Sequence, residues 1–235
     1  MKKFSLLVAS AALSFFAAGL GFASDAPAAA TAAPSTGATA PDPSSEPLIA
    51  DPLHDPAWKD LFARLAPQRS RISQFEERRF FPFRKEPTLL TGEIRMIPGR
   101  GLSLHYLTPE PRIVIVDEQG VLLRDEHGRS RAAPADSRAQ AVSHALFNIL
   151  RFDTSALAQS FELRGHRDGS HWTLVFAPRD SAIADLIGRI VVTGTDARLE
   201  HISMQKSSTQ HIDIALRDTR ENVIFAGDVL DRYFR

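Results

Sequence analysis

Residues 101–123 read GLSLHYLTPEPRIVIVDEQGVLL, which is three short apolar runs separated by turn residues. Leu102, Leu104 and Tyr106 alternate with polar residues, and this is the period of a β-strand with one buried face. The run 113–116 is apolar on both faces and leads into a Glu-Gln-Gly turn. The stretch therefore predicts a β-meander that carries almost no side chain able to perform chemistry.

The same alternation continues on both sides of this stretch. Further strands are expected at 72–83, 88–97, 161–163, 171–176, 189–195, 199–206 and 210–216, with a last one at 222–225. Helical spacing is confined to 56–65, 136–150 and 154–159. Because strands and helices do not alternate, the predicted fold is mainly β: a curved, unclosed antiparallel barrel of about eleven strands with few helices.

The first 52 residues have a different composition. Lys2 and Lys3 precede an apolar stretch that ends in small residues, so 1–23 is predicted to be a secretory signal peptide; an uncleaved membrane anchor is the alternative. Residues 24–52 are rich in Ala, Pro, Ser and Thr and have no aromatic residue, which predicts a disordered linker. The folded domain is then expected at 53–235.

Composition excludes several classes of function. The chain has no cysteine, so it has no disulfide and no lipidated cysteine. It carries 28 basic and 28 acidic residues in an interspersed order, which is unlike the one-signed surface of a nucleic-acid-binding protein.

Motifs for catalysis are missing as well. There is no G-x-S-x-G nucleophile elbow, phosphate loop or dinucleotide fingerprint. His166 with His171 and His201 with His211 are the suggestive pairs, but no further zinc ligand accompanies either pair. We therefore expect no enzyme activity, no metal and no cofactor.

The remaining feature is an excess of apolar side chains on a curved sheet, with an amphipathic helix set into the middle of the chain. Such a helix could close a hydrophobic cavity on the concave face, or the same residues could form a filled sandwich core. For a cavity, the expected wall residues are Ile94, Met96, Leu102, Leu104, Tyr106, Ile113, Ile115, Trp172, Leu174 and Phe176, and the expected lid residues are Val142, Leu146 and Ile149.

The order of the motifs resembles that of LolA, the family of periplasmic carriers of outer-membrane lipoproteins. The matching pieces are ISQFEERRF at 72–80, TGEIRMIP at 91–98, IVIVDEQGVLLRD at 113–125, HWTLVFAPRDSAIADLIGRIVV at 171–192 and LEHISMQKSSTQHIDIAL at 199–216. The resemblance implies a helical lid over a cavity for acyl chains. It also implies a monomer in the periplasm of a Gram-negative cell that takes lipoprotein from an inner-membrane donor to an outer-membrane acceptor.

One position departs from the family pattern. Ile97 stands where the family has an arginine that is thought to hold the lid shut, and Arg95 or Arg100 is the possible substitute. The departure leaves two alternatives open: a carrier of another amphiphile, such as a glycolipid or a polyene-type lipid, and a periplasmic interaction module without a ligand.

Overall fold

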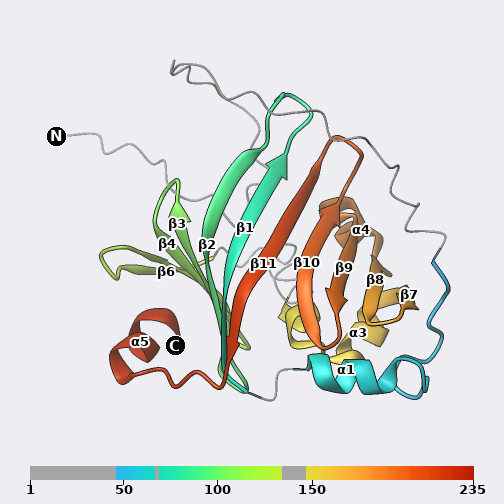
Figure 1. Cartoon of the computed structure of the whole chain (residues 1–235). Helices are drawn as coiled ribbons and strands as arrows, with labels where there is room; N and C mark the ends of the chain where they lie inside the picture. Colours follow the sequence, from blue (N-terminus) through green and yellow to red (C-terminus); the bar gives the residue numbers. More distant parts are fainter. Residues whose placement is uncertain (1–45, 67–68, 134–146) are drawn as a thin grey trace. The chain divides into compact units, whose positions relative to one another are not determined.

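The computed structural model describes residues 46–66, 69–133 and 147–235 (Figure 1). The chain divides into two compact units, Met1–Asp42 and Pro43–Arg235, and every described residue belongs to the second. The predicted signal peptide therefore lies outside the described residues.

The second unit makes its first contacts before the predicted boundary at residue 53. The backbone N–H of Ile49 donates to the carbonyl oxygen of Leu163 at 2.9 Å, and the N–H of Gly165 donates to the carbonyl of Pro47 at 2.9 Å. Ile49 is buried, and the side chains of Glu46 and His166 approach to 2.6 Å. The last residues of the predicted linker are thus part of the folded unit.

The described residues form eleven strands. These are β1 Arg71–Phe80, β2 Thr88–Ile97, β3 Gly101–Thr108, β4 Arg112–Asp117, β5 Gly120–Asp125, β6 Ser130–Ala132, β7 Phe161–Asp168, β8 His171–Pro178, β9 Arg189–Thr195, β10 Arg198–Gln205 and β11 His211–Glu221. The helices are α1 Lys59–Leu65, α3 Thr154–Ser160, α4 Ser181–Ile187 and α5 Gly227–Tyr233, and 147–151 are helical as well.

All strands belong to one antiparallel sheet in the order β6-β5-β4-β3-β2-β1-β11-β10-β9-β8-β7 (Figure 1). The chain starts at the centre, runs out to β6, crosses to the opposite edge at β7 and returns to pair β11 with β1. The two edge strands do not pair with each other, so the predicted unclosed antiparallel sheet of about eleven strands is confirmed.

Two predicted details are wrong, and the sequence did not predict β6 or α5. The expected strand at 222–225 is absent, because Asn222 takes a left-handed backbone conformation with φ 59° and ends the ladder. Phe81 and Phe83 lie in the turn between β1 and β2, whereas the sequence placed them on a strand with Phe75.

The strand register defines two faces of the sheet. On β1 to β4, Phe75 lies opposite Gly92, and Ile94 lies opposite Leu104, which lies opposite Val114. We call the face that carries these residues the inner face. Across the β1–β11 seam it continues through the pairs Phe75–Leu216, Ile214–Ile202, Ile202–Val192 and Val192–Leu174.

Glycines on the inner face make room for aromatic rings of the neighbouring strands. A Cβ on Gly194 would lie 2.3 Å from the ring of Trp172 and 2.0 Å from the carbonyl oxygen of Arg198. A Cβ on Gly92 would lie 2.7 Å from the ring of Phe75. The two large rings therefore pack flat over strands that have no side chain at these positions.

The opposite, outer face is covered over β4 and β5 by α5. Tyr233 and Phe234 form a buried cluster with Ile113 and Ile115. Arginines of the sheet hold the same segment: the guanidinium of Arg95 stacks 3.8 Å from the centroid of the Tyr233 ring. The C-terminal helix is therefore an integral part of this half of the sheet.

We expect Gly194→Ala to lower the free energy of unfolding by about 1–3 kcal/mol, because the added methyl group overpacks Trp172 and the backbone of β10. Gly227→Ala is the matched control, since nothing lies within 4 Å of a Cβ at that position. Denaturant unfolding of both variants checks the difference. Equal stability of the two variants would contradict the close approach of Trp172 to Gly194.

A second prediction concerns the pH dependence of stability and rests on His105, which lies beneath α5. Burial, and next the charge of Arg95, lower the pKa of His105, which lies near Tyr233. The unfolded chain then binds more protons than the folded one between the lowered value and about 6.5. Stability should therefore rise with pH across this window in the wild-type protein and rise less in His105→Gln, as measured by denaturant unfolding at a series of pH values.

Candidate functional site

The inner face of β1 to β5 carries one apolar cluster. Its buried members are Phe75, Leu90, Ile94, Met96, Leu102, Tyr106, Val114, Val116, Val121 and Phe147, and Leu104, Leu123, Leu150 and Leu216 pack against them. The structure thus brings together Ile94, Met96, Leu102, Leu104 and Tyr106, five of the residues predicted as cavity wall.

Trp172, Leu174 and Phe176 lie on the inner face of the other half of the sheet. The ring of Phe152 meets that of Trp172 edge-on at 6.3 Å, and Phe161 meets Phe176 in the same way at 5.9 Å. All three predicted residues are almost completely buried. This half of the inner face is filled by the protein's own side chains.

The placement of Ile113 and Ile115 in the wall is wrong. The register pairs Ile113 with His105 and Ile115 with Ser103, so both isoleucines point to the outer face, where α5 covers them. The strand β4 is apolar on both faces, and alternation could not show which side chains point inward.

Of the three predicted lid residues, Ile149 belongs to the described part of the chain. Val142 and Leu146 are outside the described residues. Ile149 is fully buried, and Phe147 and Leu150, from the same helical segment, pack against the inner-face cluster.

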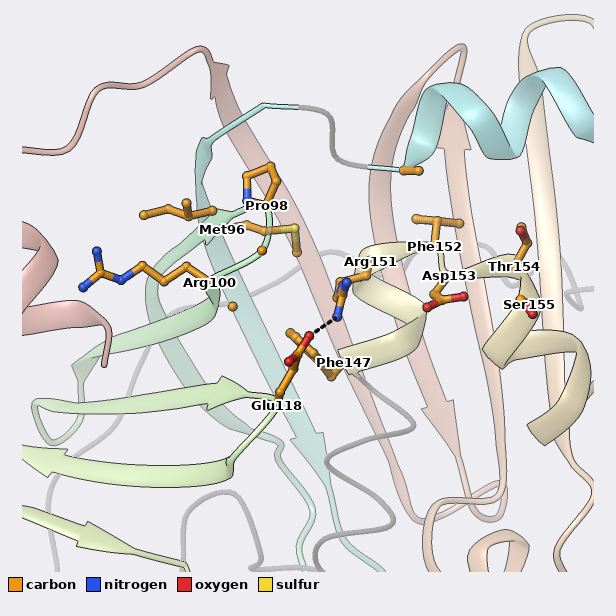
Figure 2. A pocket seen from close by; sticks show the side chains of 14 residues that line it. Met96, Pro98, Arg100, Glu118, Phe147, Arg151, Phe152, Asp153, Thr154 and Ser155 are labelled. Atoms are coloured by element: carbon orange, nitrogen blue, oxygen red, sulfur yellow. Dashed lines mark ion pairs between the residues drawn. The ribbon is translucent and has the colours of Figure 1, made fainter.

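A cavity of about 300 Å³ opens beside this helical segment, at the end of the sheet where β2 turns into β3 (Figure 2). Its volume is at the lower end of the range for ligand pockets. Met96, Phe147 and Phe152 supply apolar surface, and the polar groups come from Arg100, Glu118, Arg151, Asp153, Thr154 and Ser155. The site therefore joins apolar surface to a charged rim, which suits an amphiphilic molecule.

The rim charges are only loosely paired. Arg151 Nη1 lies 4.0 Å from Glu118 Oε1, the ion pair drawn in Figure 2, and the Arg151 guanidinium lies 4.9 Å from the centroid of the Phe147 ring. The carboxylate of Asp153 instead accepts from the backbone N–H of Ala156 and caps α3. Arg151 is thus the rim cation that lies directly over the apolar surface.

A second cavity of about 40 Å³ lies on the inner face between Met96, Ile94, Leu150 and Leu216. Met96 lines both cavities. Its sulfur accepts a long contact of 3.7 Å from Arg71 Nη2. Methionine adapts its shape easily, so a rotation of this one side chain would extend the first cavity toward the second.

The far end of the inner face is polar. The Tyr106 hydroxyl donates to Glu77 Oε2 at 2.9 Å, and Arg79 Nε donates to the other oxygen of the same carboxylate. The Arg112 guanidinium lies 4.3 Å from the centroid of the Tyr106 ring. Burial, and then the charge of Glu77, raise the pKa of Tyr106, so the phenol stays protonated and remains a donor. This buried network ends the apolar surface of the inner face near the turn between β1 and β2.

The two candidate latch arginines point elsewhere. Arg95 is on the outer face with Glu93 and Tyr233. Arg100 lines the mouth of the cavity of about 300 Å³ but extends away from Arg151, and its Nε donates to the carbonyl oxygen of Arg235 at 2.9 Å (Figure 2). Both arginines therefore hold the C-terminal segment.

His166 and His171 lie on the paired strands β7 and β8, where His171 is opposite Asp168, two residues from His166 on the same face. His201 and His211 are not brought together. His201 lies opposite Ala215, and His211 lies opposite Gln205, so four residues of strand, roughly 13 Å, separate them along the ladder. Within residues 46–66, 69–133 and 147–235, no group of three or more His, Cys, Asp or Glu side chains could hold a metal ion.

Several residues of the site were not predicted from the sequence. Phe147 lies in the expected helix at 136–150 but off its apolar stripe, and Phe152 follows the end of that helix. Glu77 and Arg79 read as ordinary surface charges. The interruption of the apolar pattern of β1 by these two charges was the signal that could have marked the polar end.

Comparison with known proteins shows likenesses at the level of solved structures. No family model and no curated protein matches the chain. A chain of the MucA/MucB complex of Pseudomonas aeruginosa is 17% identical over 73% of this chain and 58% of that chain, with a TM-score of 0.42. A putative outer membrane lipoprotein-sorting protein domain from Vibrio parahaemolyticus is 11% identical over 72% and 92% of the two chains, with a TM-score of 0.42.

A LolA superfamily protein from Nitrosomonas europaea is 8% identical over 73% of this chain and 96% of that chain, with a TM-score of 0.38. The group that the sequence motifs resemble is thus present among the structural neighbours. At these identities and TM-scores the likenesses assign neither a ligand nor an activity. The helices described in this chain also lack the length and apolar character needed to cross a bilayer.

We expect Tyr106→Phe to lower the free energy of unfolding by about 1–3 kcal/mol, because the buried carboxylate of Glu77 loses a donor. Tyr233→Phe is the matched control, since its hydroxyl makes only a 3.4 Å contact with His105. Denaturant unfolding compares the two variants. A larger loss in the control would show that the Glu77 network adds little to stability.

Proposed function

We propose that this protein is a carrier that shields the acyl chain of an amphiphile from water. The observation that carries the proposal is the cavity of about 300 Å³, in which the apolar side chains of Met96, Phe147 and Phe152 meet a charged rim. Each methylene group that leaves water contributes about 0.8 kcal/mol, so even a short buried length of acyl chain binds appreciably.

The position of the cavity supports this role. It borders the apolar cluster of β1 to β5, whereas the inner face beside α1 and α3 is filled by aromatic and aliphatic side chains. Trp58, just before α1, and Leu174 both reach close to Gly165. An acyl chain entering beside Arg151 would therefore extend along Met96 and Ile94 toward the smaller cavity.

The finer proposal is transfer of lipoprotein across the periplasm, from an inner-membrane donor to an outer-membrane acceptor. It rests on the predicted signal peptide and on the resemblance of the sequence motifs to LolA. The position of Arg151 over the apolar surface is equally suited to a different amphiphile with an acidic head group, and such a cargo is the second candidate.

Binding of a fluorescent fatty acid to the purified full chain tests the proposal. Met96→Trp should weaken binding by at least about tenfold, because the larger ring fills the cavity, whereas Met96→Leu conserves volume and should bind as the wild type does. Ser155→Trp narrows the mouth from an exposed rim position and should weaken binding without disturbing the core.

Two outcomes would contradict the carrier. One is no binding of the probe by the wild-type chain, which would favour an interaction module without a ligand. The other is equal binding by the wild type, Met96→Trp and Ser155→Trp, which would place the lipid elsewhere. Mass spectrometry of ligands extracted from the full chain, purified from a Gram-negative periplasm, then separates acylated lipoprotein from another amphiphile.

A further inference from the structure

The turn between β1 and β2 exposes aromatic side chains that the fold does not use. Its sequence is Phe-Pro-Phe-Arg-Lys-Glu-Pro at 81–87. The rings of Phe81 and Phe83 stack with centroids 5.4 Å apart, and Phe83 is 66% exposed. The preceding residue, Phe80, is instead held by stacking on His211 with centroids 4.1 Å apart. The tip of this hairpin is thus anchored at its base and apolar at its end.

Other exposed apolar side chains lie at the same end of the sheet. Leu89 is 51% exposed just after the turn, and Leu107 is 45% exposed next to Thr108, which pairs with Thr91 of β2. Single exposed apolar residues are ordinary on protein surfaces, but a group of them gathered at one end marks a contact surface. We call Phe81, Phe83, Leu89 and Leu107 the apolar tip.

The charge beside the apolar tip is basic. Arg84 and Lys85 are exposed and follow Phe83 directly, and Arg84 Nη1 donates to the Thr88 hydroxyl at 2.9 Å, which holds it beside the turn. The neighbouring acidic residue is Glu86. Aromatic side chains flanked by Lys and Arg are the composition that binds the interface of an anionic membrane.

The shape of the hairpin favours a lipid surface over a folded protein partner. The β1–β2 hairpin extends beyond the ends of β3 and β4 (Figure 1). A stable protein interface usually covers about 800 Å² on each partner, and a projecting turn with the exposed ring of Phe83 stacked on the half-buried Phe81 offers a narrow contact instead. A bilayer accepts such a point contact, because each ring enters the interfacial layer independently.

We propose that the apolar tip, with Arg84 and Lys85, docks the protein on an anionic lipid surface, with Phe83 entering the interface. This inference goes beyond the carrier function and does not depend on it. The cavity beside Arg151 lies at the opposite end of β2, roughly 30 Å away by the rise of a strand from Leu89 to Pro98. Docking by the tip would leave the mouth of the cavity turned away from the lipid surface and free for a partner.

Co-sedimentation of the full chain with vesicles tests the proposal. We expect binding to vesicles of phosphatidylcholine mixed with phosphatidylglycerol, and weaker binding to phosphatidylcholine alone. Phe83→Ser should lower the partition coefficient by at least about tenfold, since the variant lacks the phenyl ring that enters the lipid interface. In the double variant Arg84→Gln, Lys85→Gln the partition coefficient onto mixed vesicles should fall by at least about tenfold. Its binding should also lose most of its dependence on salt concentration.

Ile224→Ser is the matched control, because Ile224 is 96% exposed but lies outside the apolar tip. It should bind vesicles as the wild type does. Thermal unfolding of each variant checks that the fold is retained, which the exposure of all the substituted side chains favours. Binding of the fluorescent fatty acid should be unchanged in Phe83→Ser, which separates this proposal from the carrier function.

Any one of the following results would overturn the proposal. The wild-type chain could fail to bind mixed vesicles, Phe83→Ser could bind as well as the wild type, or Ile224→Ser could lose as much binding as Phe83→Ser. Capture of a periplasmic protein by the wild type and not by Phe83→Ser, without vesicle binding, would identify the tip as a protein-binding site and would also overturn it.

Discussion

The pairing of β1 with β11 holds the two halves of the sheet together. These strands lie next to each other in the sheet and far apart in the chain, with Phe75 opposite Leu216 and Phe80 opposite His211. Every other pairing joins strands that follow one another. Without the β1–β11 ladder the protein would be two separate meanders, and the inner face would not be continuous from Ile94 to Leu174. This pairing closes most of the chain into one loop, and closing a long loop costs conformational entropy. The burial of the side chains packed on both halves of the sheet has to offset that cost.

The inner faces of the two halves of the sheet are packed differently. The half formed by β7 to β10 is filled by large rings, and Gly194 allows Trp172 to lie against the strand. The half formed by β1 to β5 carries the rings of Phe75 and Tyr106 among aliphatic side chains, and the space beside Phe147 and Met96 is not filled by described residues. A cavity therefore occurs where the packing passes from one half to the other, and the side chains at that border decide its volume.

Charged side chains divide the remaining surfaces of β1 to β5. Glu77, Arg79 and Tyr106 close the inner face near the β1–β2 turn, so apolar surface on that face extends toward the cavity beside Arg151. On the outer face, Arg95 and Arg124 hold α5, the latter through the carbonyl oxygens of Asp231 and Arg232. The cavity and the apolar tip thus stand at opposite ends of the same strands, with the polar network between them. Each can serve a different contact without disturbing the other.

The sequence by itself determined most of the antiparallel strands and the absence of alternating helices, because the period of two and the turn residues are local properties of the chain. It also placed Ile94, Met96, Leu102, Leu104 and Tyr106 on one face, since these residues alternate with polar ones. It did not show the short edge strand β6. Only the tertiary structure decided that Ile113 and Ile115 face α5, because β4 is apolar on both sides and has no local signal of direction. The same holds for the cavity and for the exposure of Phe83. Both depend on which side chains from distant segments cover a surface, and this is determined by tertiary packing.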